Sequence, residues 1–180
     1  MMKRGELLRL CTVSRVVMFY DTDGCVYRML RSGAALEEVI LLYRDRLIGE
    51  KREEGNVFLN EGKNYIWRLV VGESGLTPFN SANAHIGVGD SDQPESPEQT
   101  GLLGTNKYYK SMDGGYPIVS GGSVRFRATF DYNEANFTWN EWTVANGPGD
   151  EYVNINRKVT RLGTKTSDAI WALEVTLTFT

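Results

Sequence analysis

Alternating apolar and polar residues mark a strand in the middle of the chain. One side of this strand would carry Val124, Phe126, Ala128 and Phe130, and the other side would carry Arg125, Arg127 and Thr129. Since successive side chains of a strand point to opposite faces, the pattern is typical of a strand with one buried face. Turn-forming residues follow at 131–135, and the alternation resumes at Phe137 and Trp139. We therefore predict a hairpin over 124–142, on which the rest of the chain packs.

The second half of this hairpin contains a change of phase. Trp142 is in the opposite phase to Phe137 and Trp139. An extra residue in one strand of a pair shifts the alternation in this way. The sequence therefore predicts a β-bulge or a sharp bend near Asn140 and Glu141.

A second clear alternation ends the chain, at 169–180. Its apolar side carries Trp171, Leu173, Val175, Leu177 and Phe179. This predicts a last strand that is paired within a sheet. Shorter runs at 85–88, 108–112 and 154–162 predict further strands, and the last of these has only a weak apolar face.

The clearest helix signal lies at 60–72. Asn60 is a residue type that caps helix N-termini, and Gly72 is placed to end the helix. Ile66, Leu69 and Val70 would share the apolar face of this helix.

The first 55 residues read as an arm separate from the main domain. Apolar runs at 15–20 and 25–30 flank an Asp-Gly turn, which predicts a hairpin. The spacing of Leu36, Val39 and Tyr43 favours an amphipathic helix over 34–47, although 39–43 would also suit a strand. The charged run 50–55 alternates in sign and ends at Gly55, which is typical of a solvated connection. We therefore predict an N-terminal arm at 1–55 and a main domain at 56–180.

Composition favours an all-β main domain. The 180 residues include 19 Gly, only 5 Pro and 11% aromatic residues, a turn-rich composition with strand-forming side chains. The length suits one domain, or one domain with an arm. The predicted fold class is mainly β: an antiparallel, jelly-roll-like β-sandwich with one short helix near 60–72 and the N-terminal arm.

Charge and hydropathy argue against two classes of partner. The net charge of -3 provides no basic surface for nucleic acid. No run approaches the roughly 20 apolar residues that a membrane-spanning helix needs. Cys11 and Cys25 have neither C-x-x-C spacing nor companion histidines. We therefore expect reduced thiols in a cytosolic setting, and no metal site built on them.

The candidate catalytic and metal-binding residues all have more ordinary explanations. His85 is the single histidine and has no nucleophile motif around it. Asp21 and Asp23 resemble the start of a calcium loop, but the later ligands of that motif are missing. Asp90 and Asp92 could bind a cation, yet acidic residues in such loops are more often solvated. We expect no catalytic residue, no cofactor and no metal.

Two carboxylates leave a hydrolase alternative open. Glu134 and Glu141 flank the aromatic segment and could be the acid and base of a glycosidase. Surface carboxylates beside a hairpin are the more ordinary explanation.

Aromatic residues could form a carbohydrate-stacking or partner-binding surface. Aromatic residues at alternating strand positions more often belong to the core. Trp142 is the best exception, because it is out of phase. The candidate partner-binding surface comprises Tyr108, Tyr109, Tyr116 and Trp142.

Several segments carry a resemblance to a known family. They include N-E-G-K-N-Y-I-W-R-L-V-V-G at 60–72, I-G-V-G-D at 86–90, Q-T-G-L-L-G-T-N-K at 99–107 and M-D-G-G-Y-P at 112–117. The pattern continues with F-R-A-T-F at 126–130, E-A-N-F-T-W-N-E-W-T-V-A-N-G at 134–147, N-R-K-V at 156–159 and L-G-T-K at 162–165. In these segments, residues 60–180 resemble bacteriophage virion proteins related to tail-collar fibre domains and to capsid or tail accessory proteins. The resemblance implies a β-sandwich without catalytic residues or cofactor that works through its surfaces.

The leading expectation is a non-enzymatic virion structural protein that decorates or cements the capsid, with its N-terminal arm on neighbouring subunits. The expected partners are further copies of the chain, for example in a trimer, and other virion proteins such as the major capsid protein or tail and neck proteins. The alternative is a tail, neck or fibre-base adaptor. The third hypothesis is a host-glycan-binding module. The setting would be the virion, assembled in the host cytoplasm.

Overall fold

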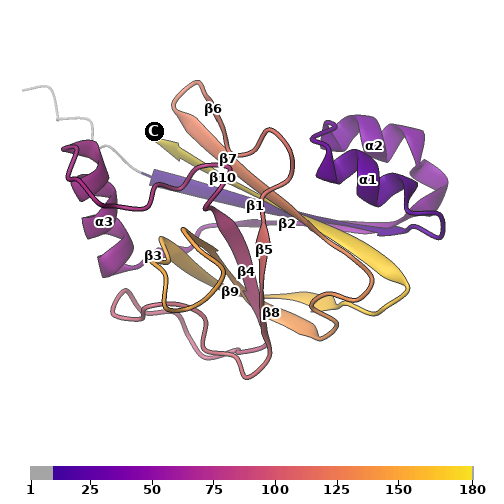
Figure 1. Ribbon diagram of the computed structural model, residues 1–180. Helices are drawn as coiled ribbons and strands as arrows, with labels where there is room; N and C mark the ends of the chain where they lie inside the picture. Colours follow the sequence, from indigo (N-terminus) through magenta and orange to yellow (C-terminus); the bar gives the residue numbers. More distant parts are fainter. Residues whose placement is uncertain (1–9, 180) are drawn as a thin grey trace, which may run out of the picture.

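Two antiparallel sheets of five strands lie face to face in the computed structural model, which describes residues 10–179 (Figure 1). The first sheet has the order β2 (Leu47–Glu54), β1 (Leu10–Tyr20), β10 (Ala169–Phe179), β7 (Ser123–Phe130) and β6 (Ile118–Ser120). The second has the order β3 (Val57–Phe58), β9 (Asn156–Thr164), β8 (Thr138–Ala145), β4 (His85–Gly89) and β5 (Lys107–Ser111). The prediction of a mainly β, antiparallel sandwich is confirmed.

The core between the sheets is built around the predicted apolar face of the last strand. β10 lies in the middle of the first sheet, and Trp171, Leu173 and Val175 are buried against the second sheet. The rings of Phe130, Trp139 and Trp171 stack edge to face, with centroids 4.7 and 4.8 Å apart. Such aromatic contacts add to the stabilisation that comes from burying apolar area.

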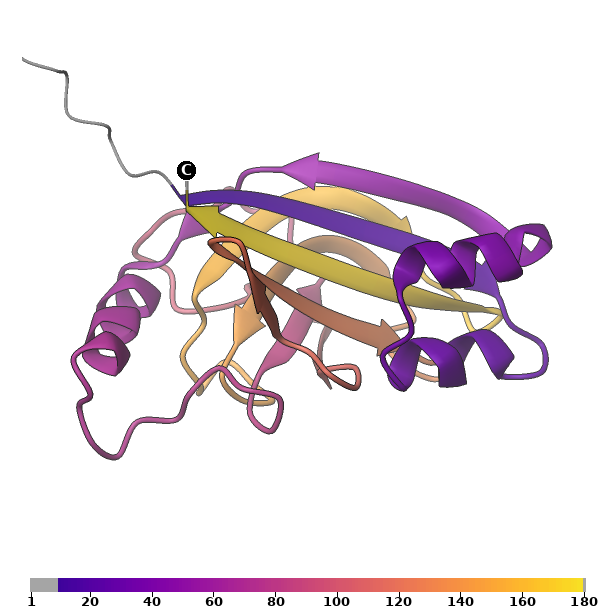
Figure 2. The same ribbon diagram turned by 90° about the horizontal axis from the view of Figure 1, so that it is seen from above.

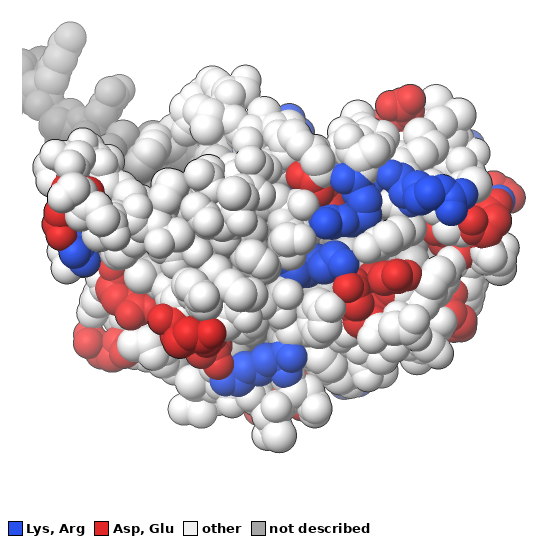
Figure 3. Space-filling view, viewed as in Figure 1, with Lys and Arg blue, Asp and Glu red and all other residues white. Residues whose placement is uncertain are grey.

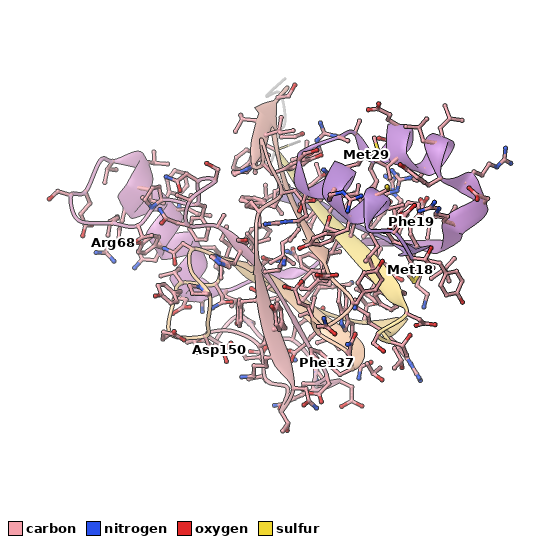
Figure 4. The ribbon with its side chains drawn as sticks, turned by 45° about the vertical axis from the view of Figure 1, so that its right-hand side comes forward. Met18, Phe19, Met29, Arg68, Phe137 and Asp150 are labelled. Atoms are coloured by element: carbon pink, nitrogen blue, oxygen red, sulfur yellow. The ribbon has the colours of Figure 1, made fainter. Side chains whose placement is uncertain are left out.

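The other face of the first sheet is buried as well. Helices α1 (Cys25–Arg31) and α2 (Leu36–Leu42), followed by a 3-10 turn at Arg44–Arg46, lie across it (Figure 2). Phe19 of β1 packs on this side, and Met29 of α1 packs against the same cluster (Figure 4). The cluster also contains Val17, Val26, Leu30, Leu36, Val39, Ile170 and Ala172. The sheet is therefore covered by the second sheet on one face and by two helices on the other.

A buried ion pair joins the helices to the sheet. Arg127 of β7 donates from Nε to Asp113 at 2.8 Å, and neither side chain is exposed. The same guanidinium donates to the carbonyl oxygens of Leu30 and Ala34, each at 2.8 Å. Asp113 also accepts from Arg31 of α1, at 2.9 Å. Arg127 and Thr129 from the predicted polar face of this strand are thus buried under the helices, with the charge of Arg127 paired, while Arg125 is exposed.

The predicted helix at 60–72 is confirmed as α3 (Asn60–Val70), at one end of the sandwich (Figure 1). The N-cap position belongs to Leu59 rather than to Asn60, and no side chain caps the helix. Gly62 allows close seating, because a Cβ there would lie 2.6 Å from the backbone of Ile155. Gly72 follows the helix in the left-handed region, with φ of 74°, as its predicted role in ending the helix requires.

The predicted hairpin over 15–30 is wrong, because its second half forms helix α1. The carboxylate of Asp21 accepts from the backbone N–H groups of Val26 and Tyr27, at 3.1 and 2.8 Å. These bonds satisfy donors at the start of the helix, which a strand would instead offer to a neighbouring strand. The prediction of a helix within 34–47 is confirmed by α2. The structure therefore has three α-helices in its described part, where the sequence predicted one with a second favoured.

The predicted separation of an arm at 1–55 does not match the sheet order. β1 pairs with β10 along its whole length, from Leu10 opposite Phe179 to Tyr20 opposite Ala169. The charged run 50–55 is mostly the edge strand β2, where charged side chains discourage pairing with other chains. Residues from Leu10 onward therefore belong to the sandwich. The first nine residues of the predicted arm, and Thr180, lie outside the described residues.

The predicted hairpin over 124–142 is also wrong, although both of its strands are present. β7 pairs with β10 and β6 in the first sheet, while β8 pairs with β4 and β9 in the second. The connection at 131–137 therefore crosses between the two sheets. The bulge predicted near Asn140 and Glu141 is confirmed by a register shift between Trp139 and Glu141.

Replacing Trp171 by alanine should lower the free energy of unfolding by about 3–5 kcal/mol, because the ring is 4% exposed and fills the core. The measurement is urea unfolding followed by circular dichroism. The matched control is Trp67→Ala on α3, where the ring is 65% exposed and the expected change is within about 0.5 kcal/mol. Equal losses for the two variants would contradict the central position of β10.

Candidate functional site

An apolar groove of about 410 Å³ lies at the end of the sandwich where α3 is found. Its walls come from the starts and ends of distant elements: β1, β10, the β6–β7 turn, α3 and the loop after α3. Representative lining residues are Leu10, Ile66, Phe79, Val119, Leu177 and Phe179. None of the described residues that line the groove is ionisable. The groove can therefore bind apolar groups, and its described lining residues offer no ionisable acid or base.

The groove exists because the apolar face of β10 extends beyond the covered part of the core. Leu177 is buried, but two residues later Phe179 is 56% exposed. Val119 on the short edge strand β6 is 79% exposed beside it. On α3, Ile66 lines the groove, while Trp67, Val70 and Val71 at the end of the helix are exposed. Contiguous exposed apolar surface of this kind typically marks an interaction site.

The surface between α3 and β6 carries little charge. Figure 3 shows a broad uncharged area on this part of the molecule, while Lys, Arg, Asp and Glu lie toward the helices α1 and α2, along the lower edge and at the outer left edge by α3. A partner that covers this area would need to desolvate few charges. We name the groove together with exposed Val119 and Phe179 the apolar end surface.

The predicted partner-binding residues do not form one exposed surface. Trp142 is fully buried in the core, because the bulge before it restores its side chain to the inner face. Tyr116 is also buried, with the guanidinium of Arg127 4.4 Å from its ring centroid. Tyr108 and Tyr109 are half-buried neighbours on β5 that point to opposite faces. Tyr108 contacts Phe130 of the core, whereas Tyr109 lies over Gly87 and bonds to Asp150.

Glu141 is a buried structural carboxylate. It accepts from Arg157 Nε at 2.6 Å, and both side chains have no exposure. It also accepts from the backbone N–H groups of Gly104, at 2.6 Å, and of Leu103, at 3.1 Å. Gly104 permits this approach, since a Cβ there would lie 2.9 Å from Glu141 Oε1. The pair therefore fixes the loop that covers the outer face of the second sheet.

The carboxylate of Glu134 also has close hydrogen-bonding partners, so it is not free to transfer a proton. Lys110 Nζ lies 2.6 and 2.7 Å from its two oxygens, and Tyr108 donates to it at 2.9 Å. Burial, together with the hydrogen bond to Glu134, raises the pKa of Tyr108 to about 12. The geometry does not favour a glycosidase acid and base pair, because each carboxylate already has cationic and hydrogen-bonding partners.

Structural partners also engage His85, Asp21 and Asp23. His85 Nδ1 lies 2.8 Å from the carbonyl oxygen of Asn83. Asp23 pairs with Arg46 at 2.7 Å, and Asp21 caps α1, so the two do not converge as calcium ligands. Within residues 10–179, no group of three or more His, Cys, Asp or Glu side chains is placed to hold a metal ion.

Lys165 is a buried cation that the sequence did not single out. Its Nζ donates to the carbonyl oxygen of Asp131 at 2.6 Å and to Asn136 Oδ1 at 2.9 Å. Burial lowers the pKa of this lysine to about 8. Both contacts lie in the connection between the sheets, so Lys165 holds that crossing in place.

Replacing Glu141 by alanine should lower the free energy of unfolding by about 3–5 kcal/mol, because Arg157 would be left as an unpaired buried charge. The measurement is urea unfolding at neutral pH. The matched control is Glu38→Ala, which removes an exposed carboxylate from α2 and should change the stability little. An unchanged midpoint for both variants would show that Arg157 finds water or another partner.

No described helix is long and apolar enough to cross a lipid bilayer.

Comparisons with known proteins add no further identification. No protein-family model matches the chain, and the comparisons with curated proteins and with solved structures found no match either.

Proposed function

We propose that this protein is a non-enzymatic structural protein that assembles with further copies of itself through the apolar end surface. The observation that carries the proposal is a groove without ionisable lining residues beside strongly exposed apolar side chains. A groove with this lining suits burial of apolar groups rather than bond-making chemistry.

A second copy fits this surface because concave and protruding apolar features lie side by side. Val119 and Phe179 line the groove and also stand exposed at its rim. In a twofold contact, each copy can insert its rim into the groove of the other, since the same patch is used on both sides. The low charge of this surface in Figure 3 suits such self-association, because few like charges would meet.

The setting that we propose is a bacteriophage virion, with decoration of the capsid as the leading role. The resemblance of residues 60–180 to phage virion proteins supports this, as does the self-complementary apolar surface on a β-sandwich. A tail, neck or fibre-base adaptor is the alternative role, and it would use the same surface in fewer copies.

Self-association is tested by sedimentation velocity across a range of protein concentrations. The wild-type chain should form a dimer or a larger closed oligomer, and Val119→Asp should weaken association at least about ten-fold, because it places a charge in an apolar contact. The matched control is Leu41→Asp, since Leu41 is 75% exposed on α2, far from the groove. Circular dichroism should show both variants folded.

A wild-type chain that stays monomeric at every concentration would overturn the proposed assembly. Equal weakening by Leu41→Asp would move the contact away from the apolar end surface. The virion role is tested separately, by quantitative mass spectrometry of purified particles of the phage that encodes the chain. A copy number in simple ratio to the major capsid protein supports decoration, a handful of copies supports the tail or neck, and absence from the particle overturns the virion setting.

A further inference from the structure

The bulge between β8 and β9 opens the outer face of the second sheet. Trp139 lies opposite Gly163, whereas Glu141 lies opposite Val159. Asn140 alone on β8 therefore faces the stretch 160–162 on β9. Bulges bend a strand and redirect its side chains, and they often lie next to functional sites.

A polar groove of about 590 Å³ lies over this bulge. Its walls come from β8, β9 and the loop that follows β4. The lining residues that carry the argument are Asp90, Asp92, Asn106, Phe137, Asn140 and Arg161. Figure 4 shows Phe137 at the lower edge of the molecule, well apart from Arg68 on α3. The polar groove shares no lining residue with the apolar groove.

The polar side chains on one wall are held in place before any ligand arrives. Asp90 accepts from the backbone N–H of Asn106 at 3.1 Å and from its side-chain amide at 2.6 Å. Asn140 Nδ2 donates to the carbonyl oxygen of Asp90 at 2.9 Å. These bonds fix the positions of three amide or carboxylate groups that face one hollow. Ligand binding would therefore order few additional side chains on this wall.

The loop that carries Asp90 and Asp92 is anchored from below by the buried pair. Arg157 donates to the carbonyl oxygen of Gln93 and to Gln99 Oε1, each at 2.9 Å. Glu141 holds the other end of the loop through Leu103 and Gly104. The wall is thus part of the packed structure rather than a free surface loop.

The chemistry of the groove suits a ligand with many neighbouring hydroxyl groups. Carboxylate and amide oxygens accept from hydroxyls, while amide and guanidinium N–H groups donate to them. A half-buried aromatic ring such as that of Phe137 can cover the apolar face of a sugar ring. A cation suits the site less well, because both oxygens of Asp90 already accept from Asn106.

We propose that this polar groove is a carbohydrate-binding site. In it, Asp92, Asn140 and Arg161 bond to sugar hydroxyls, and Phe137 packs against the ring. Asp92 on the loop after β4 and Arg161 on β9 are exposed and line the same groove, so they offer an acceptor and a bidentate donor to one ligand and give the site its selectivity. This assignment uses residues other than the predicted aromatic set, and it stands independently of the proposed self-association.

The experiment is a glycan array of defined bacterial and animal oligosaccharides probed with the full-length chain, followed by NMR titration with the sugars that bind. Asp92→Ala and Arg161→Ala should each weaken binding at least about ten-fold, because each removes charged hydrogen bonds. The matched control is Asp45→Ala, an exposed carboxylate beside α2, which should leave binding unchanged. Binding should also persist in EDTA.

Three results would overturn the proposal. The first is the absence of binding to any oligosaccharide on the array. The second is binding that Asp92→Ala and Arg161→Ala both leave intact in the NMR titration, since this would move the sugar to another surface. The third is loss of binding in EDTA, which would make a bound cation the ligand of the groove.

Discussion

The architecture depends on the buried pair of Asp113 and Arg127. Two charges without exposure are costly to desolvate, so the pair is stable only with its full set of hydrogen bonds. The structure supplies them from three directions: the carbonyl oxygens of Leu30 and Ala34, the hydroxyl and N–H of Thr129, and the guanidinium of Arg31. Part of these hydrogen bonds comes from the helix pair. If the helices left the sheet, the buried charge of Arg127 would therefore lose hydrogen-bond partners. The helices α1 and α2 are therefore held against the outer face of the first sheet.

The second sheet also has a buried ion pair on its outer face, but this pair anchors a loop instead of helices. Glu141 and Arg157 form the buried pair, and the loop over 93–104 provides further acceptors and donors. The register shift at Asn140 lies beside this loop, and the polar groove is found there. The two sheets thus carry similar polar anchors on their outer faces, and the polar groove lies on that of the second sheet.

The sequence predicts side-chain phase well and strand partners poorly. The alternation through Trp171 and Leu173 correctly identified the core face of β10, and the phase change before Trp142 correctly placed the bulge. Pairing depends on residues far away in the chain, so β7 and β8 were joined in a hairpin although they lie in different sheets. Helix α1 was missed because its capping partner, Asp21, lies several residues before its first turn.

The candidate surfaces were harder to predict for a related reason. The exposure of Val119 and Phe179 depends on where the second sheet stops covering the first, which no local pattern records. Trp142 was assigned to a surface because it was out of phase, yet the same bulge returned it to the core. Asp90 and Asp92 were noticed as acidic residues, but their setting in a groove depends on β9, about 70 residues later in the chain.

The placement of the two grooves has a consequence for binding strength. The apolar groove is built from α3, β1, β10 and the β6–β7 turn, and the polar groove from β8, β9 and the loop after β4. Copies that associate through the apolar groove would leave the polar groove open on every subunit. Several weak sites on one rigid assembly bind a repetitive surface far more tightly than one site does, provided that their spacing matches. Assembly and carbohydrate binding would then reinforce each other, because the fold separates the proposed assembly surface from the proposed carbohydrate groove.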